Sequence, residues 1–193
     1  PTLTDTRIQD IVETNVNQQY ELRTGSVLDG DGNTNTLTGD AGRDYIQGFG
    51  GADILNGFGS ADFLDGGSGN DTLNGGDGND ILIGGLGNDV MVGGLGDDIY
   101  RVDSATDVTT EQAGEGTDTI EIDAAFNPGT YTIALNFENA LLSGNLNINV
   151  IGNASANRIT GNDGNNILSG LDGDDRLLGG KGNDTLIGGN GSE

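Results

Sequence analysis

A nine-residue repeat is the feature that most constrains how this chain can fold. Four consecutive copies fill residues 66–101 without slippage, reading GGSGNDTLN, GGDGNDILI, GGLGNDVMV and GGLGDDIYR. Each copy has glycine at its first, second and fourth places, aspartate at its sixth place and an apolar residue at its eighth. A fixed internal period indicates one small structural unit stacked on itself.

The register of nine extends well beyond these four copies. It begins at Gly39, runs unbroken for seven units, and returns at Gly152. Residues 29–38 fit one unit with a single insertion, and residues 113–121 keep the second- and fourth-place glycines, the aspartate and the apolar residue in place. In the second and third units, aromatic or serine residues replace turn glycines, namely Phe49, Phe58 and Ser60.

We therefore divide the chain into four segments. We expect an N-terminal lead-in or cap over residues 1–28, a first repeat block over 29–101, a degenerate connector over 102–151, and a second, truncated block over 152–193. The lead-in contains Ile8, Ile11 and Val12 at a spacing that fits either a short helix near residues 5–13 or a first strand.

The connector alternates polar and apolar residues (Tyr131, Ile133 and Leu135, then Leu146, Ile148 and Val150). This period of two indicates half-buried strands, so we expect the connector to continue the stack with longer coils.

The repeat also predicts the shape of each coil. The glycine-rich half must turn sharply, and the rest of the unit is enough for a short strand whose middle residue points inward. Two units then make one eighteen-residue coil, so each unit lies beneath the unit two places along the chain. One edge of the stack collects Asp44, Asp62, Asp80 and Asp98, and the opposite edge collects Asp53, Asp71 and Asp89. The predicted core is the eighth-place column: Ile46, Leu55, Leu64, Leu73, Leu82, Met91 and Tyr100.

The charge of the chain excludes several function classes. Its 31 acidic residues against 7 basic ones give a formal net charge of -24. This balance argues against nucleic acid and anionic membrane surfaces as partners, and it predicts disorder unless positive charge enters the structure. Without histidine or cysteine, zinc sites and the usual catalytic bases and nucleophiles are missing, so we expect no catalytic residues in this segment. An activity elsewhere in a longer parent protein is compatible with this prediction.

Paired carboxylates beside exposed turn carbonyls are hard oxygen donors. Calcium takes six to eight such ligands in flexible geometry, whereas magnesium demands a tighter octahedron and retains its waters. The acidic edges therefore favour calcium. About five ions in the first block and about three elsewhere would add roughly +16 and bring the net charge to about -8, which a small folded domain tolerates.

The nine-residue repeat units resemble the RTX family, the haemolysin-type calcium-binding nonapeptide repeat of secreted bacterial toxins, proteases and lipases. The resemblance covers residues 39–101 and 152–193 well and residues 29–38 and 113–121 weakly. It implies an all-β fold, a right-handed parallel β-roll or β-solenoid that folds on binding calcium. It further implies an extracellular bacterial setting and export by a type I secretion system without an N-terminal signal.

The same resemblance implies a set of metal ligands, with several calcium ions (about five to eight) as the cofactor. The side chains occupy the sixth places, and the backbone ligands come from the turn glycines of the four perfect copies. The side chains are Asp44, Asp53, Asp62, Asp71, Asp80, Asp89, Asp98, Asp118, Asn157, Asn166, Asp175 and Asp184. The glycines are Gly66, Gly67, Gly69, Gly75, Gly76, Gly78, Gly84, Gly85, Gly87, Gly93, Gly94 and Gly96. Asn157 and Asn166 depart from the family pattern, so we expect calcium to be weaker or absent there.

Two further interpretations stay open. As an alternative function, the segment would serve a neighbouring extracellular enzyme or adhesin as a polysaccharide-binding appendage, although only seven cationic side chains are available for a polyanionic glycan. Seventh-place side chains should form an outward column of Tyr45, Phe63, Ile81 and Ile99, which we interpret as cross-strand pairing that stabilises the sheet. Weak lateral self-association or partner docking through this column is the alternative. Flanking domains of the parent protein complete the expected partners.

Overall fold

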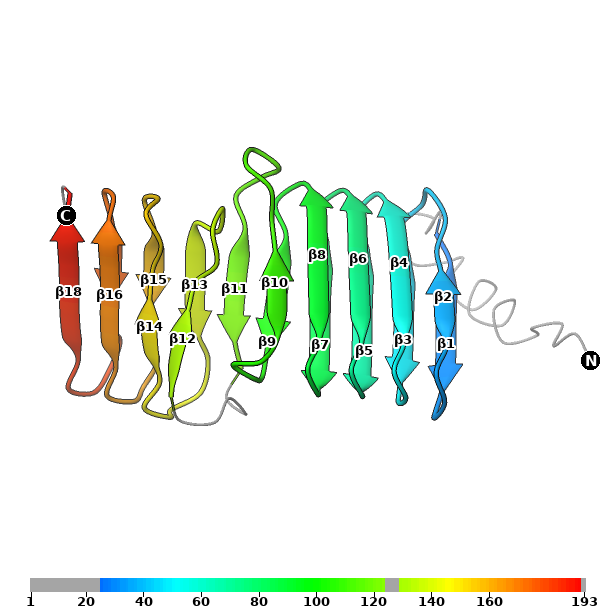
Figure 1. Cartoon of the computed structure of the whole chain (residues 1–193), viewed down its shortest axis with the longest axis horizontal. Coiled ribbons are helices and arrows are strands. Elements are labelled where there is room, and N and C mark those ends of the chain that lie inside the picture. The colour runs from blue at the N-terminus through cyan, green and yellow to red at the C-terminus, as the bar shows by residue number, and fades with distance from the viewer. Residues whose placement is uncertain (1–24, 124–128, 192–193) are drawn as a thin grey trace, which may run out of the picture.

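The chain folds into a flattened β-solenoid, seen in a computed structural model that describes residues 25–123 and 129–191 (Figure 1). These residues contain strands and turns and no helix, and hence no helix long and apolar enough to cross a membrane. The predicted helix or strand near residues 5–13 lies outside them. The expected all-β parallel solenoid is confirmed.

One face of the solenoid is a continuous nine-stranded parallel sheet. Its order is β1-β3-β5-β7-β9-β11-β13-β15-β17, so every second strand of the chain joins it. Its strands are β1 (Val27–Asp31), β3 (Tyr45–Phe49), β5 (Phe63–Ser68), β7 (Ile81–Leu86), β9 (Ile99–Val102), β11 (Thr119–Ile122), β13 (Asn139–Leu142), β15 (Arg158–Thr160) and β17 (Arg176–Leu178).

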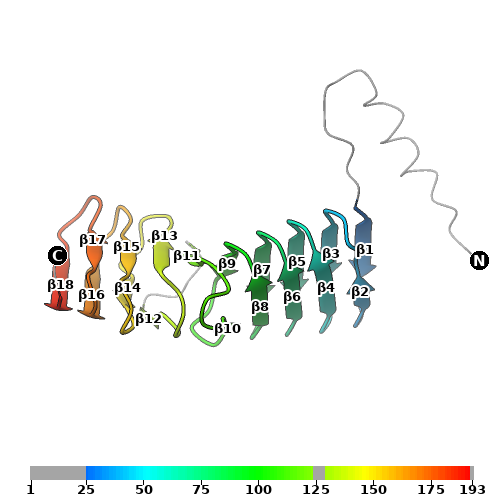
Figure 2. The ribbon, with the colours of Figure 1, turned by 90° about the horizontal axis from the view of Figure 1, so that it is seen from above.

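The opposite face consists of two shorter sheets that follow one another along the axis (Figure 2). The first contains β2 (Thr36–Thr38), β4 (Ile54–Gly59), β6 (Thr72–Asp77), β8 (Val90–Leu95) and β10 (Val108–Thr110). The second contains β12 (Thr130–Thr132), β14 (Asn149–Ile151), β16 (Ile167–Asp172) and β18 (Thr185–Asn190). Strands β10 and β12 belong to different sheets, so the ladder on this face is interrupted in the connector.

Strand register gives the length of each coil directly. In the first block Tyr45 lies opposite Phe63, which is the eighteen-residue offset that the repeat predicts. The offset rises to twenty between β9 and β11, where Ile99 lies opposite Thr119. It is again twenty between β11 and β13, and it has returned to eighteen where Arg158 of β15 lies opposite Arg176 of β17. The connector is therefore a run of lengthened coils within one solenoid.

The core is a single column of apolar side chains between the two faces. All seven predicted eighth-place residues, from Ile46 to Tyr100, are fully buried. The column continues through the connector with residues that include Ile120, Phe137 and Ile148. The predicted alternation fails at Leu135, which is 71% exposed. The chain turns there, because the next residue, Asn136, has a left-handed backbone (φ 68°) and ends the extended segment.

Positive φ angles explain why glycine occupies the second place of the repeat. Gly67 and Gly76 have φ values of 96° and 117°, a region that side chains with a Cβ disfavour. Phe49 and Phe58 hold the same place with φ values of 69° and 80°, and both side chains are exposed. Stacking of the coils therefore holds these turns at positive φ even where the residue is phenylalanine, and this strains the backbone at both positions.

Candidate metal centre

The sixth-place aspartates lie where each turn of the first block enters its strand. The backbone N–H of Asp44 donates to Oδ1 of Asp62, that of Asp62 donates to Asp80, and that of Asp80 donates to Asp98, each at 2.7 Å. On the opposite edge, Asp53 donates to Asp71 and Asp71 to Asp89, each at 2.8 Å. The predicted pairing of aspartates one full coil apart is confirmed, and the two edges carry separate rows of carboxylates.

Only one oxygen of each carboxylate finds a partner in this way. The second oxygen, Oδ2, is buried and accepts no hydrogen bond within the protein at Asp53, Asp62, Asp71, Asp80, Asp89, Asp98 and Asp175. A buried, unpartnered carboxylate oxygen is costly because neither water nor a donor replaces its hydration. Repetition of the same defect in coil after coil indicates a common partner that the protein chain does not supply.

The first-place glycine of each turn brings a backbone oxygen to the same point. A Cβ atom placed on Gly75 would lie 2.7 Å from the carbonyl oxygen of Gly93 and closer still to Oδ2 of Asp80. Gly66 has the equivalent arrangement, with the carbonyl oxygen of Gly84 and Oδ2 of Asp71. A carboxylate oxygen and a carbonyl oxygen of the next coil therefore converge beside each of these two glycines. This donor set is hard and all-oxygen, and it fits calcium.

The glycines predicted as ligands divide into two groups. Carbonyl oxygens of the first-place glycines, Gly66, Gly75, Gly84 and Gly93, converge with a carboxylate oxygen of the preceding coil. The second- and fourth-place glycines instead stack closely on backbone atoms of the preceding coil, as Gly85 does on Gly67. Their part in metal ligation stays a prediction.

Burial raises the pKa of several sixth-place aspartates of the first block. Asp62, Asp80 and Asp89 have pKa values of about 6, chiefly because they are buried and further because neighbouring aspartates repel their charge. Burial likewise raises the pKa of Asp98 to about 7. A hydrogen bond from the backbone opposes each shift without cancelling it. Without a cation, these four carboxyl groups therefore bind protons at a higher pH than an ordinary aspartate does.

Two turns of the second block have an asparagine amide where most other turns have an aspartate carboxylate. Asn157 and Asn166 donate through Nδ2 to the carbonyl oxygens of Phe137 and Ile148, at 3.0 Å and 2.8 Å. The amide Oδ1 atoms lie beside the first-place glycines Gly152 and Gly161, where the aspartate turns have a charged Oδ2, so these turns carry less negative charge. This is consistent with the expectation of weak or absent calcium there. Asp175 and Asp184 each accept a backbone hydrogen bond from one of these asparagines, at 2.8 Å and 2.9 Å.

Three acidic residues outside the predicted set join the rows. Asp107 accepts from the backbone of Asp89 at 3.2 Å, and Glu138 accepts from that of Asp118 at 2.9 Å. Asp118 in turn accepts from Asp98 at 2.8 Å. Asp107 occupies the next sixth place after Asp98, so the register alone could have found it. A third residue, Glu111, lies eighteen positions after Gly93 and is also in register, whereas Glu138 belongs to a lengthened coil, where the spacing gives no such signal.

Two of the basic side chains in the described part of the solenoid pair with acidic ones, and two others, Arg158 and Arg176, lie opposite each other in the ladder. Arg101 pairs with Glu121 and Lys181 with Asp163, each at 2.7 Å. Both cations are thus matched locally by acids. The polysaccharide-binding alternative gains no support from these two ion pairs.

A parallel β-solenoid whose turns carry rows of half-satisfied carboxylates belongs to the class of calcium-binding repeat proteins. The RTX calcium-binding nonapeptide repeat model matches the chain at residues 29–64, 56–91, 65–100, 149–176 and 160–192, more than half of its length. The chain belongs to this RTX family. It is a calcium-binding repeat module, and such repeats occur in secreted bacterial proteins. No curated protein matches the chain.

Proposed function

We propose that the sixth-place aspartates and first-place glycine carbonyls of this chain hold calcium ions between successive coils, and that the module folds when they do so. The observation that carries the proposal is the row of buried Oδ2 atoms that lack a partner. At Asp53, Asp62, Asp71 and Asp80, this oxygen lies with a glycine carbonyl oxygen of the next coil against the same first-place glycine. Calcium would supply the positive charge that both oxygens require.

The charge of the chain couples this binding to folding. A net charge of -24 opposes compaction, and the aspartate rows add local repulsion between neighbouring carboxylates. Two carboxylates about 5 Å apart repel by about 3 kcal/mol at an effective dielectric constant of about 20. In a metal-free fold the aspartates would have one carboxylate oxygen without a partner, whereas in the calcium-bound fold both oxygens would have one. Binding free energy then becomes folding free energy.

The setting that suits such a module is outside the cell. A chain that stays unfolded at low calcium can be exported and can fold where calcium is abundant, as type I secretion requires. We propose that this segment acts as a rigid extracellular spacer beside flanking domains of a larger bacterial protein. No chemical step is assigned to it, since its carboxylates are accounted for by the repeat.

Calcium titration with a matched variant tests the ligand assignment. Isothermal titration calorimetry of the wild type should record several calcium ions bound per chain, with magnesium producing little heat at the same concentrations. Asp71→Asn together with Asp89→Asn should remove binding from one edge and spare the other. Identical stoichiometry in the wild type and this double variant would refute the assignment.

A further inference from the structure

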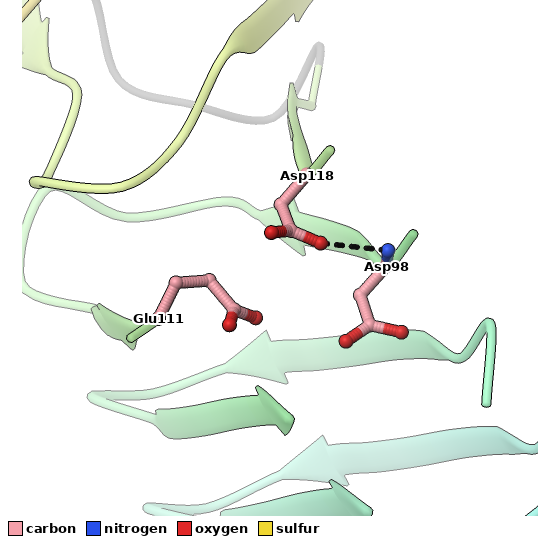
Figure 3. Close-up of side chains that lie close together, drawn as sticks. All are labelled: Asp98, Glu111 and Asp118. Carbon is pink, nitrogen blue, oxygen red and sulfur yellow. Dashed lines mark hydrogen bonds between the residues drawn. The ribbon is translucent and has the colours of Figure 1, made fainter. Parts of the chain in front are cut away.

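The connector places one acidic side chain where the repeat would place a glycine. Glu111 directly follows β10, and it lies eighteen positions after Gly93, the interval that separates equivalent positions in the first block. It is outside the residues that match the RTX family model. Its carboxylate points toward those of Asp98 and Asp118, which come from the entrances to β9 and β11 (Figure 3).

These three carboxylates form a tight and buried group. One oxygen from each of Asp98, Glu111 and Asp118 lies within 4.8 Å of the others, and the three residues are 1%, 6% and 1% exposed. Across residues 25–123 and 129–191, no other group of three potential metal-binding side chains is gathered so closely. The group therefore differs from the repeat turns in the number of charged side chains that meet at one point.

Glu111 supplies a side-chain oxygen in the position of a turn carbonyl. A Cβ placed on Gly75 would meet Oδ2 of Asp80 and, at 2.7 Å, the carbonyl oxygen of Gly93. A Cβ placed on Gly93, one coil further on, would meet Oδ2 of Asp98 and, at 2.5 Å, Oε1 of Glu111. The neutral carbonyl ligand of the repeat is thus replaced by a charged one.

Tyr100 fixes the orientation of this carboxylate. Its hydroxyl accepts a hydrogen bond from the backbone N–H of Gly93 and donates to Oε1 of Glu111. Its ring is fully buried and packs edge-on against Phe137, with centroids 5.0 Å apart. The other glutamate oxygen, Oε2, is buried without a partner, as is Oδ2 of Asp98. Two charged oxygens of the group are therefore left unsatisfied.

We propose that Asp98, Glu111 and Asp118 form a three-carboxylate cation site that marks the end of the regular block and binds calcium more tightly than the repeat turns. This inference rests on the proposed function for Asp98 and Asp118 and extends it to Glu111, which the repeat does not include. Affinity at oxygen sites rises with the number of charged ligands, and a preoriented glutamate loses less freedom on binding. A charge of -3 also matches a trivalent lanthanide better than the pair of carboxylates at a repeat turn does.

Chelator-competition titration of the whole chain with calcium tests the site. In the wild type, one binding event should be at least about tenfold tighter than the rest, since one site has an additional charged ligand. Glu111→Gln should abolish that event and leave the weaker ones. Glu115→Gln is the matched control, because it removes the same charge from the same loop outside the group, and it should keep a distinct tight event that is far less weakened than in Glu111→Gln.

A second variant guards against a folding defect in Glu111→Gln. Tyr100→Phe keeps the buried ring and removes only the hydroxyl that orients Glu111, so it should weaken the tight event severalfold and no other. If Glu111→Gln lacks the wild-type β signal at saturating calcium, the calcium titration of Tyr100→Phe tests the inference in its place. Unchanged tight binding in every folded variant would overturn the inference. Absence of any calcium binding in the wild type would instead refute the proposed function.

Discussion

The backbone N–H of Asp62 donates a 2.7 Å hydrogen bond to Oδ1 of Asp80, the aspartate one full coil further along the chain. The same carboxylate leaves its Oδ2 atom buried and without a partner. One side chain therefore ties two coils together through the backbone and holds an unsatisfied oxygen between them. The stability of the stack should depend on what satisfies that oxygen.

Replacement of Asp80 by asparagine should separate these two roles. Asp80→Asn keeps the oxygen that accepts from Asp62 and removes the charge, so the calcium concentration at half-folding should rise roughly tenfold. Circular dichroism at increasing calcium measures that midpoint. Asp77→Asn, an exposed change in the same turn, alters the net charge equally and should leave the midpoint nearly unchanged. Equal midpoints for Asp80→Asn and Asp77→Asn would contradict the account.

The first-place glycines should tolerate no side chain. In Gly75→Ala the new methyl group would crowd the carbonyl oxygen of Gly93 and Oδ2 of Asp80, and we expect a loss of about 1–3 kcal/mol in unfolding free energy. Urea denaturation at saturating calcium measures it. Gly59→Ala is the control, since its Cβ would come no nearer than 3.9 Å to a neighbouring atom and Gly59 does not have a positive φ. A smaller loss for Gly75→Ala than for Gly59→Ala would disprove the crowding.

The eighth-place core and the pairing of alternate units were predictable because a strict period leaves one way to stack the units. Ile46 through Tyr100 point inward since each occupies the second position of a short strand. Glu138 was not predictable, because two extra residues in a coil shift later positions out of register. Glu111 keeps the register of Gly93, but a glutamate at a glycine place does not by itself indicate that its side chain meets Asp98 and Asp118. The break between β10 and β12 likewise depends on the lengths of turns in three dimensions, which periodicity does not encode.

Phe49 and Phe58 mark another limit of the pattern. Aromatic residues occupy a glycine place there, yet both keep the positive φ of their glycine counterparts. The hydrogen bonds of the coils above and below determine the backbone there, and local preference is overruled. Tertiary stacking, more than any single residue, decides the turn.

Acid should stabilise the calcium-free fold. The folded pKa values of Asp80 and Asp89 are about 6 and that of Asp98 is about 7, all above the ordinary aspartate value near 4. The folded chain therefore holds more protons than the unfolded chain between about pH 4 and pH 7, and its stability falls as pH rises through that window. With chelator present, the β signal should increase when pH is lowered from 8 to 5. A β signal that is flat or decreases on acidification would contradict these shifts.

Protons and calcium should also compete for the same oxygens. As pH falls through about 7 and then about 6, more calcium should be required for half-folding, because the carboxylates must lose protons to bind it. Repeating the calcium titration at pH 8 and pH 6 measures this. A lower calcium requirement at pH 6 than at pH 8 would show that acid stabilisation of the calcium-free fold outweighs competition.

The seventh-place column should stabilise the sheet without joining copies of the chain. Tyr45 and Phe63 stack with ring centroids 4.8 Å apart and planes 4° from parallel, and Phe63 lies opposite Ile81 in the ladder. Changing Phe63 and Ile81 to Ser should lower the unfolding free energy by about 1–2 kcal/mol through lost cross-strand contacts. Light scattering should give the same monomer mass for the variant and the wild type. A wild-type multimer that dissociates in the variant would favour the docking interpretation.

The most direct test of calcium-coupled folding is the far-ultraviolet circular dichroism of the whole chain at neutral pH, first with excess chelator and then with excess calcium. We expect a disordered spectrum with chelator, because the net charge of -24 and the rows of unpartnered carboxylate oxygens oppose the fold. Added calcium should produce a β spectrum, and further chelator should reverse it. A β spectrum of equal strength with chelator and with calcium would contradict the central claim.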